Sequence, residues 1–62
     1  MKPMSELKGF NMERILLKNK NGYFCFGYYK DGMIEVDGEW SHPSTWKEWC
    51  SIAELKYALE VS

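Results

Sequence analysis

The 62-residue chain has few of the residue types on which enzymes and metal sites usually depend. It contains one histidine, His42, and two cysteines, Cys25 and Cys50, without a Cys-x-x-Cys pair. Two cysteines are too few for a disulfide framework, so we expect free thiols in a reducing compartment. Because catalysis and metal binding need several such groups together, we expect no enzyme activity, no cofactor and no metal ion.

The chain also lacks an excess of charge of either sign and lacks long apolar runs. Eight basic and nine acidic residues give a formal net charge of −1. That balance creates no field to attract a phosphate backbone. No run is long enough to span a bilayer, and no signal-peptide core is present. We therefore expect a cytoplasmic protein that does not enter a membrane.

Hydrophobic residues, in contrast, make up 45% of the chain and aromatic residues 16%, which is too rich for a disordered protein. Residues 1–62 have room for one small domain, whose core is marginal because so short a chain buries only about 60% of its unfolded surface. Residues 1–9 have no clear period, and we expect them to form a loose N-terminal arm or a single turn, which Leu7 and Phe10 attach to the body.

The stretch Gly22–Val36 has the composition of a β-hairpin, with a strong turn signal at Asp31-Gly32. A two-residue Asp-Gly loop places Tyr29 opposite Ile34. A three-residue loop, 30–32, shifts the pairing by one residue, and such a shift moves every side chain to the other face. We predict the three-residue loop because it gathers on one face the apolar side chains of Phe24, Phe26, Tyr28, Ile34 and Val36.

Residues 11–18 are predicted to form the preceding strand, because Asn21-Gly22 is the strongest two-residue hairpin signal. A type I′ turn at this pair places Leu17 opposite Phe26, on the same face that the second hairpin selects. Gly27 lies in the middle of the next strand, where a glycine indicates a bulge, a bend or a close contact.

The C-terminal segment has the pattern of a helix. Ser51 and Glu54 form a capping box. A helical stripe follows, formed by Ile52, Leu55, Ala58 and Leu59. A helix this short is not stable alone in water, so we expect its stripe to dock on the sheet. Residues 45–50 stay undecided between strand and helical turn. The predicted fold is α+β: a three- to four-stranded antiparallel β-meander with one C-terminal α-helix packed on one face.

Three patterns that could carry chemistry have more ordinary structural explanations. His42 has no second histidine or cysteine at metal-ligand spacing. Cys25 lies in a strand, without the helix N-terminus or cationic neighbour that would lower the pKa of its thiol. The alternating carboxylates of Glu35, Asp37 and Glu39 are more typical of a solvated sheet face than of an acid–base pair.

Two resemblances bear on function. Residues 21–28 distantly resemble the aromatic strand of RNA-recognition motifs, in which exposed rings stack on bases. In addition, residues 27–32 (GYYKDG), followed by Gly38-Glu39-Trp40 and Thr45-Trp46, resemble small phage and prophage accessory proteins. Those proteins often carry a Tyr-Tyr-x-Asp-Gly turn and a Thr-x-Trp closing strand. The second resemblance implies a viral or mobile-element origin and supplies no activity.

The chain has more aromatic residues than so small a core can hold, and exposed aromatic patches mark protein–protein contacts. We therefore predict a non-enzymatic protein-interaction module, such as a phage-encoded binder or inhibitor of a host protein. The predicted protein-binding residues are Tyr23, Tyr29, Glu35, Asp37, Trp40, Trp46 and Trp49. The less favoured alternative is a nucleic-acid-binding module that uses Tyr23, Tyr29 and Lys18.

A homodimer is also predicted, because a marginal core gains stability from association. The residues expected to pair with a second copy are Leu16, Tyr23, Tyr29 and Met33.

Overall fold

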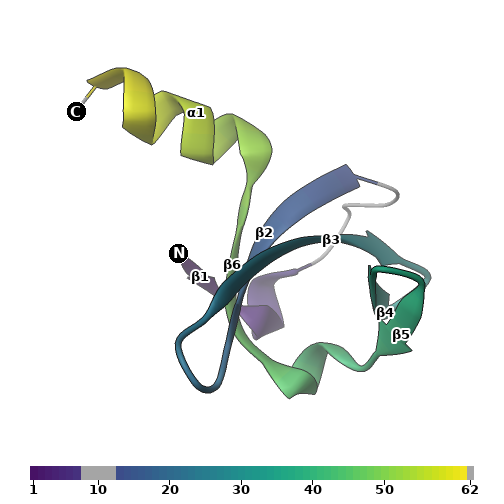
Figure 1. Cartoon of the computed structure of the whole chain (residues 1–62). Coiled ribbons are helices and arrows are strands. Elements are labelled where there is room, and N and C mark those ends of the chain that lie inside the picture. The colour runs from purple at the N-terminus through teal and green to yellow at the C-terminus, as the bar shows by residue number, and fades with distance from the viewer. Residues whose placement is uncertain (8–12, 62) are drawn as a thin grey trace.

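The computed structural model describes residues 1–7 and 13–61, which form a curled antiparallel sheet followed by a helix (Figure 1). The elements are β1 (Lys2–Pro3), a 3-10 turn (Met4–Glu6), β2 (Glu13–Asn19), β3 (Phe24–Lys30), β4 (Met33–Val36), β5 (Glu39–Ser41), a second 3-10 turn (Pro43–Thr45), β6 (Trp46–Ser51) and α1 (Ile52–Val61). The strand order is β1-β6-β2-β3-β4-β5. The predicted class, an α+β antiparallel sheet with a C-terminal helix, is confirmed. Within the described residues the sheet has six strands, so the prediction of three or four was wrong.

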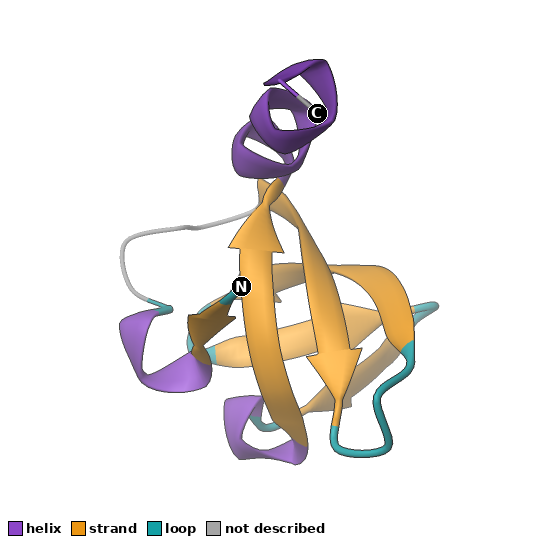
Figure 2. Ribbon diagram, turned by 90° about the vertical axis from the view of Figure 1, so that its left-hand side faces the viewer, coloured by secondary structure: helices purple, strands orange, loops and turns teal. Residues whose placement is uncertain are grey.

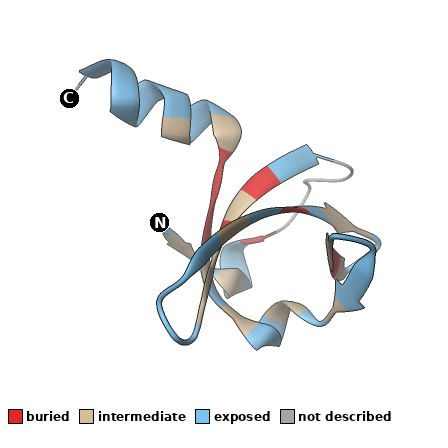
Figure 3. Ribbon diagram, in the orientation of Figure 1, coloured by how far each residue is buried: buried red, intermediate tan, exposed pale blue. Residues whose placement is uncertain are grey.

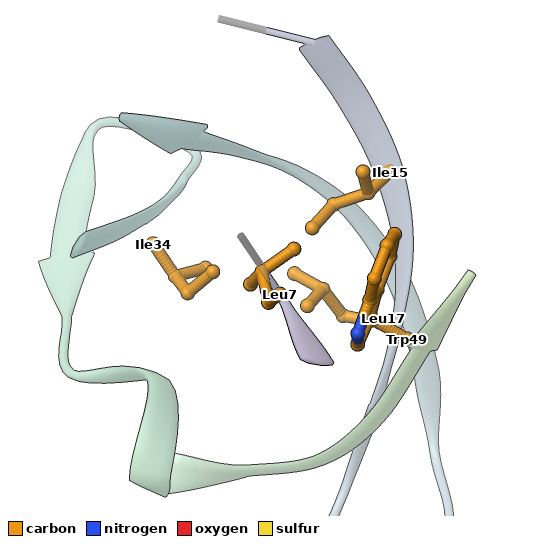
Figure 4. Close-up of a cluster of buried hydrophobic side chains, with 5 residues drawn as sticks. All are labelled: Leu7, Ile15, Leu17, Ile34 and Trp49. Carbon is orange, nitrogen blue, oxygen red and sulfur yellow. The ribbon is translucent and has the colours of Figure 1, made fainter. Parts of the chain in front are cut away.

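The sheet is curled (Figure 2), and the buried side chains lie on its concave side (Figure 4). The core cluster contains Leu7, Ile15, Leu17, Ile34 and Trp49. Figure 4 shows Leu7 between Ile34 on one side and the side chains from β2 and β6 on the other. Full burial of one such aliphatic side chain is worth roughly 1.5–3 kcal/mol, so a few residues account for much of the stability of a chain this small.

The N-terminal residues belong to this sheet, and the prediction of a loose arm was wrong for residues 2–7. Lys2 and Pro3 pair with β6 as an edge strand. The indole N–H of Trp49 donates a hydrogen bond to the carbonyl oxygen of Pro3 at 3.1 Å. Leu7 is buried, as predicted for an anchoring residue. Phe10, the other predicted anchor, lies outside the described residues.

The turn between β2 and β3 is one residue longer than predicted. The carbonyl oxygen of Asn19 accepts from the amide of Gly22 at 3.0 Å, and the amide of Asn19 donates to the carbonyl of Tyr23 at 2.9 Å. The side-chain oxygen of Asn19 also accepts from the amides of Asn21 and Tyr23. Gly22 takes the positive φ, +89°. The loop is therefore residues 20–22, and the predicted two-residue turn was wrong.

The turn between β3 and β4 is one residue shorter than predicted. Lys30 pairs with Met33, which leaves Asp31 and Gly32 as a two-residue loop. Their φ angles are +50° and +80°, and a type I′ turn requires positive φ at both central residues. Aspartate is among the few non-glycine residues that adopt this conformation readily. The three-residue loop was therefore wrong, and the two-residue alternative is the one the chain adopts.

These two differences act together and turn the aromatic side chains of β3 outward. Tyr29 lies opposite Ile34, and Leu17 lies opposite Cys25 rather than Phe26. The prediction that Phe26 lies under the helix, on the face of Ile34, was therefore wrong. The outward side chains are those of Phe24, Phe26 and Tyr28, which are 57%, 43% and 42% exposed.

Close packing at Gly27 gives the physical reason for this orientation. A Cβ atom at this position would lie 2.7 Å from the backbone oxygen of Glu35, 2.8 Å from Cγ2 of Val36 and 2.9 Å from Cδ1 of Leu17. The concave side has no room for a larger side chain here, so the ring-bearing positions alternating with Gly27 must face outward. The predicted close contact at Gly27 is confirmed.

The segment left undecided between strand and helical turn, residues 45–50, is a strand from Trp46 onward, and this strand, β6, leads directly into α1. Trp46 begins the strand, and Ser51 ends it. The hydroxyl oxygen of Ser51 accepts from the amide of Glu54 at 3.1 Å, as expected for the capping box. The carboxylate of Glu54 forms an ion pair with Lys2. The hydrogen bond from Lys2 is the main reason that the pKa of Glu54 lies below its ordinary value.

Only the beginning of α1 lies against the sheet, at β6 and β2. The rest of the helix extends beyond the strands in Figures 1 and 2. Ile52 and Leu55 are half-buried, whereas Ala58 and Leu59 are exposed. In Figure 3 the tan segments of the helix lie in its first part, and its C-terminal end is pale blue. The predicted docking of the whole stripe across one face was therefore wrong. No described residue of α1 is fully buried.

The observed register predicts that Tyr29→Ala destabilises the protein more than Phe26→Ala. Tyr29 packs against the core cluster, so its removal should lower the free energy of unfolding by about 2–4 kcal/mol through the space it leaves. Phe26 is 43% exposed, so Phe26→Ala should lower the free energy of unfolding by only about 1 kcal/mol. Urea denaturation followed by tryptophan fluorescence measures both values. The reverse ranking would show that the three-residue loop is correct.

Gly27→Ala should destabilise the protein by about 1–3 kcal/mol, because the added methyl group overlaps backbone and core atoms. The matched control is Gly32→Ala, where nothing lies within 4 Å of the added Cβ and only the positive φ is unfavourable. Thermal unfolding by circular dichroism should show the lower melting temperature for the Gly27 variant. Equal melting temperatures would contradict the close contact.

Candidate functional site

The outer surface of β3 and its neighbours carries a group of exposed rings. We call it the aromatic face, and it consists of Phe24, Phe26, Tyr28 and Trp40. The first three alternate along β3, so their Cα atoms lie roughly 6.6–6.8 Å apart along the strand. Trp40, on β5, is 54% exposed. It belongs to the same surface because Tyr28, Glu35 and Trp40 lie opposite one another on three adjacent strands.

Two cations from β2 hold rings of the aromatic face. The guanidinium carbon of Arg14 lies 4.7 Å from the centroid of the Phe26 ring. The ammonium nitrogen of Lys18 lies 5.7 Å from the centroid of Phe24 and 3.7 Å from a carboxylate oxygen of Glu48. A cation over an exposed ring contributes roughly 0.5–1 kcal/mol. These contacts restrict the orientations of the Phe24 and Phe26 rings.

A surface groove lies at one side of the aromatic face. Its walls are Tyr28, Lys30, Glu35 and Trp40, and its volume is about 270 Å³. Sites for drug-sized molecules usually measure about 300–1,000 Å³, so this groove is suited to a single side chain. The carboxylate of Glu35 is half-buried and has no ion pair with any of the residues that the structure describes.

Four of the residues predicted from the sequence lie at the surface. Glu35 and Trp40 line the groove beside Tyr28. Tyr23 is 72% exposed in the turn between β2 and β3. Asp37 is exposed in the turn between β4 and β5, where its φ is +52°. The structure thus brings Glu35 and Trp40 together in the groove, brings Asp37 and Trp40 together with Trp46 along a second hollow, and leaves Tyr23 apart in the first turn.

The three remaining predicted residues lie on the inner side of the sheet. Tyr29 and Trp46 are half-buried and pack against the core cluster, and Trp49 is fully buried within it. The indole N–H of Trp46 donates to the hydroxyl oxygen of Ser41 at 3.0 Å. These side chains build the scaffold, and they do not belong to the aromatic face.

The sequence prediction omitted Phe24, Phe26 and Tyr28 from the binding residues because it assigned them to the core. A signal for their true orientation was available. Asp-Gly is the dipeptide that type I′ turns prefer, and a glycine in the middle of a strand fits a tightly packed interior position. Giving more weight to both signals would have placed Gly27 inside and the rings outside.

The candidate chemical groups are dispersed. The Nδ1 atom of His42 accepts a hydrogen bond from the amide of Ser44 at 3.1 Å, so this side chain caps the second 3-10 turn. Burial raises the pKa of the Cys25 thiol, and the charge of Asp37 raises it further, which disfavours the reactive thiolate. Burial likewise raises the pKa of Cys50.

Neither a metal site nor a membrane-spanning helix is found in residues 1–7 and 13–61. No three histidine, cysteine, aspartate or glutamate side chains in those ranges come together in a way that could hold a metal ion. The helix there is too short to cross a bilayer. No protein-family model, curated protein or solved structure matches the chain.

Proposed function

We propose that the chain is a non-enzymatic module that binds another protein through the aromatic face. The observation that carries the proposal is the exposure of four aromatic side chains, between 42% and 57%, on one surface of the sheet. Exposed apolar groups gathered on one surface are unfavourable in water, and in soluble proteins such a patch usually marks an interaction site. Aromatic residues are also enriched among those that dominate the energy of protein interfaces.

The construction of the aromatic face supports binding with little loss of conformational entropy. Its rings stand on paired strands, and Arg14 and Lys18 restrain two of them. Aromatic side chains have only two rotatable bonds, so a preformed row of them loses little freedom when it meets a partner. Such a surface can bind without rearranging the sheet.

The charges near the aromatic face favour a protein over a nucleic acid. Glu35 and Glu48 are outward-facing carboxylates beside its rings, and the whole chain has a formal net charge of −1. Carboxylates repel phosphate groups, whereas the mixed signs suit the polar rim of a protein interface. The resemblance of residues 27–46 to phage accessory proteins suggests a host protein as the partner.

The proposed surface keeps part of the predicted set of binding residues and replaces the rest. Glu35 and Trp40 remain in it. The outward rings of β3 replace three of the predicted residues, Tyr29, Trp46 and Trp49. The predicted homodimer stays a prediction, and a second copy of the chain is one partner that the experiment below would detect.

The proposal predicts that a double variant, Phe24→Ser with Phe26→Ser, loses its partner. The wild-type chain, immobilised and exposed to lysate of its native host, should capture a protein that the double variant does not retain. The purified partner should then bind the wild-type chain at least tenfold more tightly than the double variant in calorimetry.

The matched control is Tyr57→Ser, which removes an aromatic side chain that is 68% exposed on α1, outside the aromatic face. This variant should bind the purified partner as the wild type does. Circular dichroism must show that both variants are folded. Partners that bind the double variant and the wild type equally well would contradict the proposal, and so would the absence of any captured protein.

One observation favours a second candidate function, binding of single-stranded nucleic acid. Three rings at alternate positions of one exposed strand form a platform on which bases could stack, and base–aromatic stacking is worth roughly 1–3 kcal/mol per base. Arg14 and Lys18 lie over two of these rings, where they could contact phosphate groups. This version uses Phe24, Phe26 and Tyr28 in place of the predicted Tyr23 and Tyr29.

If this second function holds, a fluorescent single-stranded oligonucleotide should bind at low ionic strength and dissociate as salt is added. The logarithm of the binding constant should fall with the logarithm of salt concentration with a slope near −0.7 for each phosphate contact. Arg14→Gln should make the slope shallower by about one contact. Fluorescence anisotropy measures this series, and no binding at low ionic strength would eliminate the nucleic-acid function.

A further inference from the structure

The molecule places two of its own lysines between an aromatic ring and a carboxylate. The ammonium nitrogen of Lys2 lies 4.9 Å from the centroid of the Trp49 ring and forms an ion pair with Glu54. Lys18 does the same between Phe24 and Glu48, as described above. Each ammonium group thus meets the negative face of a ring and a negative charge together.

A third group combines a carboxylate with two rings, and none of the cation–ring contacts or ion pairs among the described residues involves it. Tyr28, Glu35 and Trp40 stand side by side on β3, β4 and β5 and line the groove. Adjacent strands are about 4.8 Å apart, so the carboxylate stands between two rings within reach of one small group. No cation from the described residues lies over either ring or pairs with Glu35.

We propose that this groove binds the cationic side chain of a lysine or arginine on the protein partner. The inference rests on the proposed protein-binding function and specifies the chemistry of the partner. The cation would lie between the rings of Tyr28 and Trp40, with its charge at Glu35. The rings and the carboxylate would both attract the same cationic group, as a ring and a carboxylate do at Lys2 and at Lys18 of this chain.

The carboxylate of Glu35 disfavours anionic and apolar side chains as occupants of the groove. An anionic side chain would be repelled by Glu35, and an apolar one would cover this carboxylate without giving it a partner. Lys30 also lines the groove but forms no ion pair with Glu35. Its positive charge opposes an incoming cation, so Lys30 lowers the affinity and offers a test.

The experiment is an NMR titration of the full chain, followed through the indole N–H signal of Trp40. The probes are Nα-acetyl-lysine amide and Nα-acetyl-arginine amide, which together show which cation is preferred. Nα,Nε-diacetyl-lysine amide has a similar stem without the charge and serves as the neutral control. A single side chain should bind with a dissociation constant on the order of millimolar, and the neutral control should bind far more weakly.

Four variants separate the roles of the groove residues. Glu35→Gln and Trp40→Leu should each weaken cation binding roughly threefold to fivefold; for Trp40→Leu the assigned backbone amides of β4 replace the indole signal. Glu39→Gln makes the same charge change on a neighbouring exposed carboxylate that does not line the groove, and it should have no effect. Lys30→Gln should tighten cation binding roughly twofold, a change that loss of structural support would not produce.

The inference is overturned if the charged and neutral probes bind equally, or if Glu35→Gln binds the cations as tightly as Glu39→Gln. This failure differs from failure of the proposed function. A partner whose binding depends on Phe24 and Phe26 but is unchanged by Glu35→Gln would leave the protein-binding function standing without the cation. Cation binding in the groove with no captured partner would support the cation site and contradict the proposed protein-binding function.

Discussion

The close approach of β3 to its surroundings at Gly27 is the constraint on which the rest of the structure depends. Backbone and side-chain atoms from β4 and β2 occupy the space that a side chain would need. This contact lets the sheet curl around a core built from only a few large residues. Because side chains alternate along a strand, fixing one position inward fixes the direction of every other position on β3.

The aromatic face is a consequence of this constraint. The strand β3 carries three rings at one set of alternate positions, and Cys25, Gly27 and Tyr29 at the other. Once the second set faces the core, the rings must face water, which costs free energy in a chain with so little core. The cations of β2 cover part of this apolar surface and offset part of the cost. The remaining exposure is the basis of the proposed protein-binding function.

The N-terminus and the helix show how a small sheet gains stability at its edges. Lys2 belongs to the edge strand β1 and contacts both Trp49 on β6 and Glu54 on α1. It therefore connects the first strand, the last strand and the first turn of the helix through one side chain. This arrangement fixes the start of α1, whereas the remainder of the helix extends away from the sheet. The helix therefore does not cover the aromatic face.

The sequence by itself determined the fold class, both hairpin positions, the cap at Ser51 and the inward direction of Ile15, Leu17 and Ile34. These features depend on turn residues and local periods, which act within a few positions of the chain. The pairing of β1 with β6 joins residues more than forty positions apart, so no local pattern reveals it.

The face on which the rings of β3 lie was decided only by the tertiary structure. The Asn-Gly pair favoured a two-residue loop in the first hairpin, and the apolar pattern favoured a three-residue loop in the second, but the chain adopts the opposite length at each. Two compensating differences in loop length turn over the whole strand between them while leaving its neighbours unchanged. The space at Gly27 selects between these solutions, and that space exists only when β2, β3 and β4 are packed together. Hence the sequence prediction named Glu35 and Trp40 but assigned Phe24, Phe26 and Tyr28 to the core, because the apolar pattern outweighed the turn signal at Asp31-Gly32 until the packing around Gly27 was known.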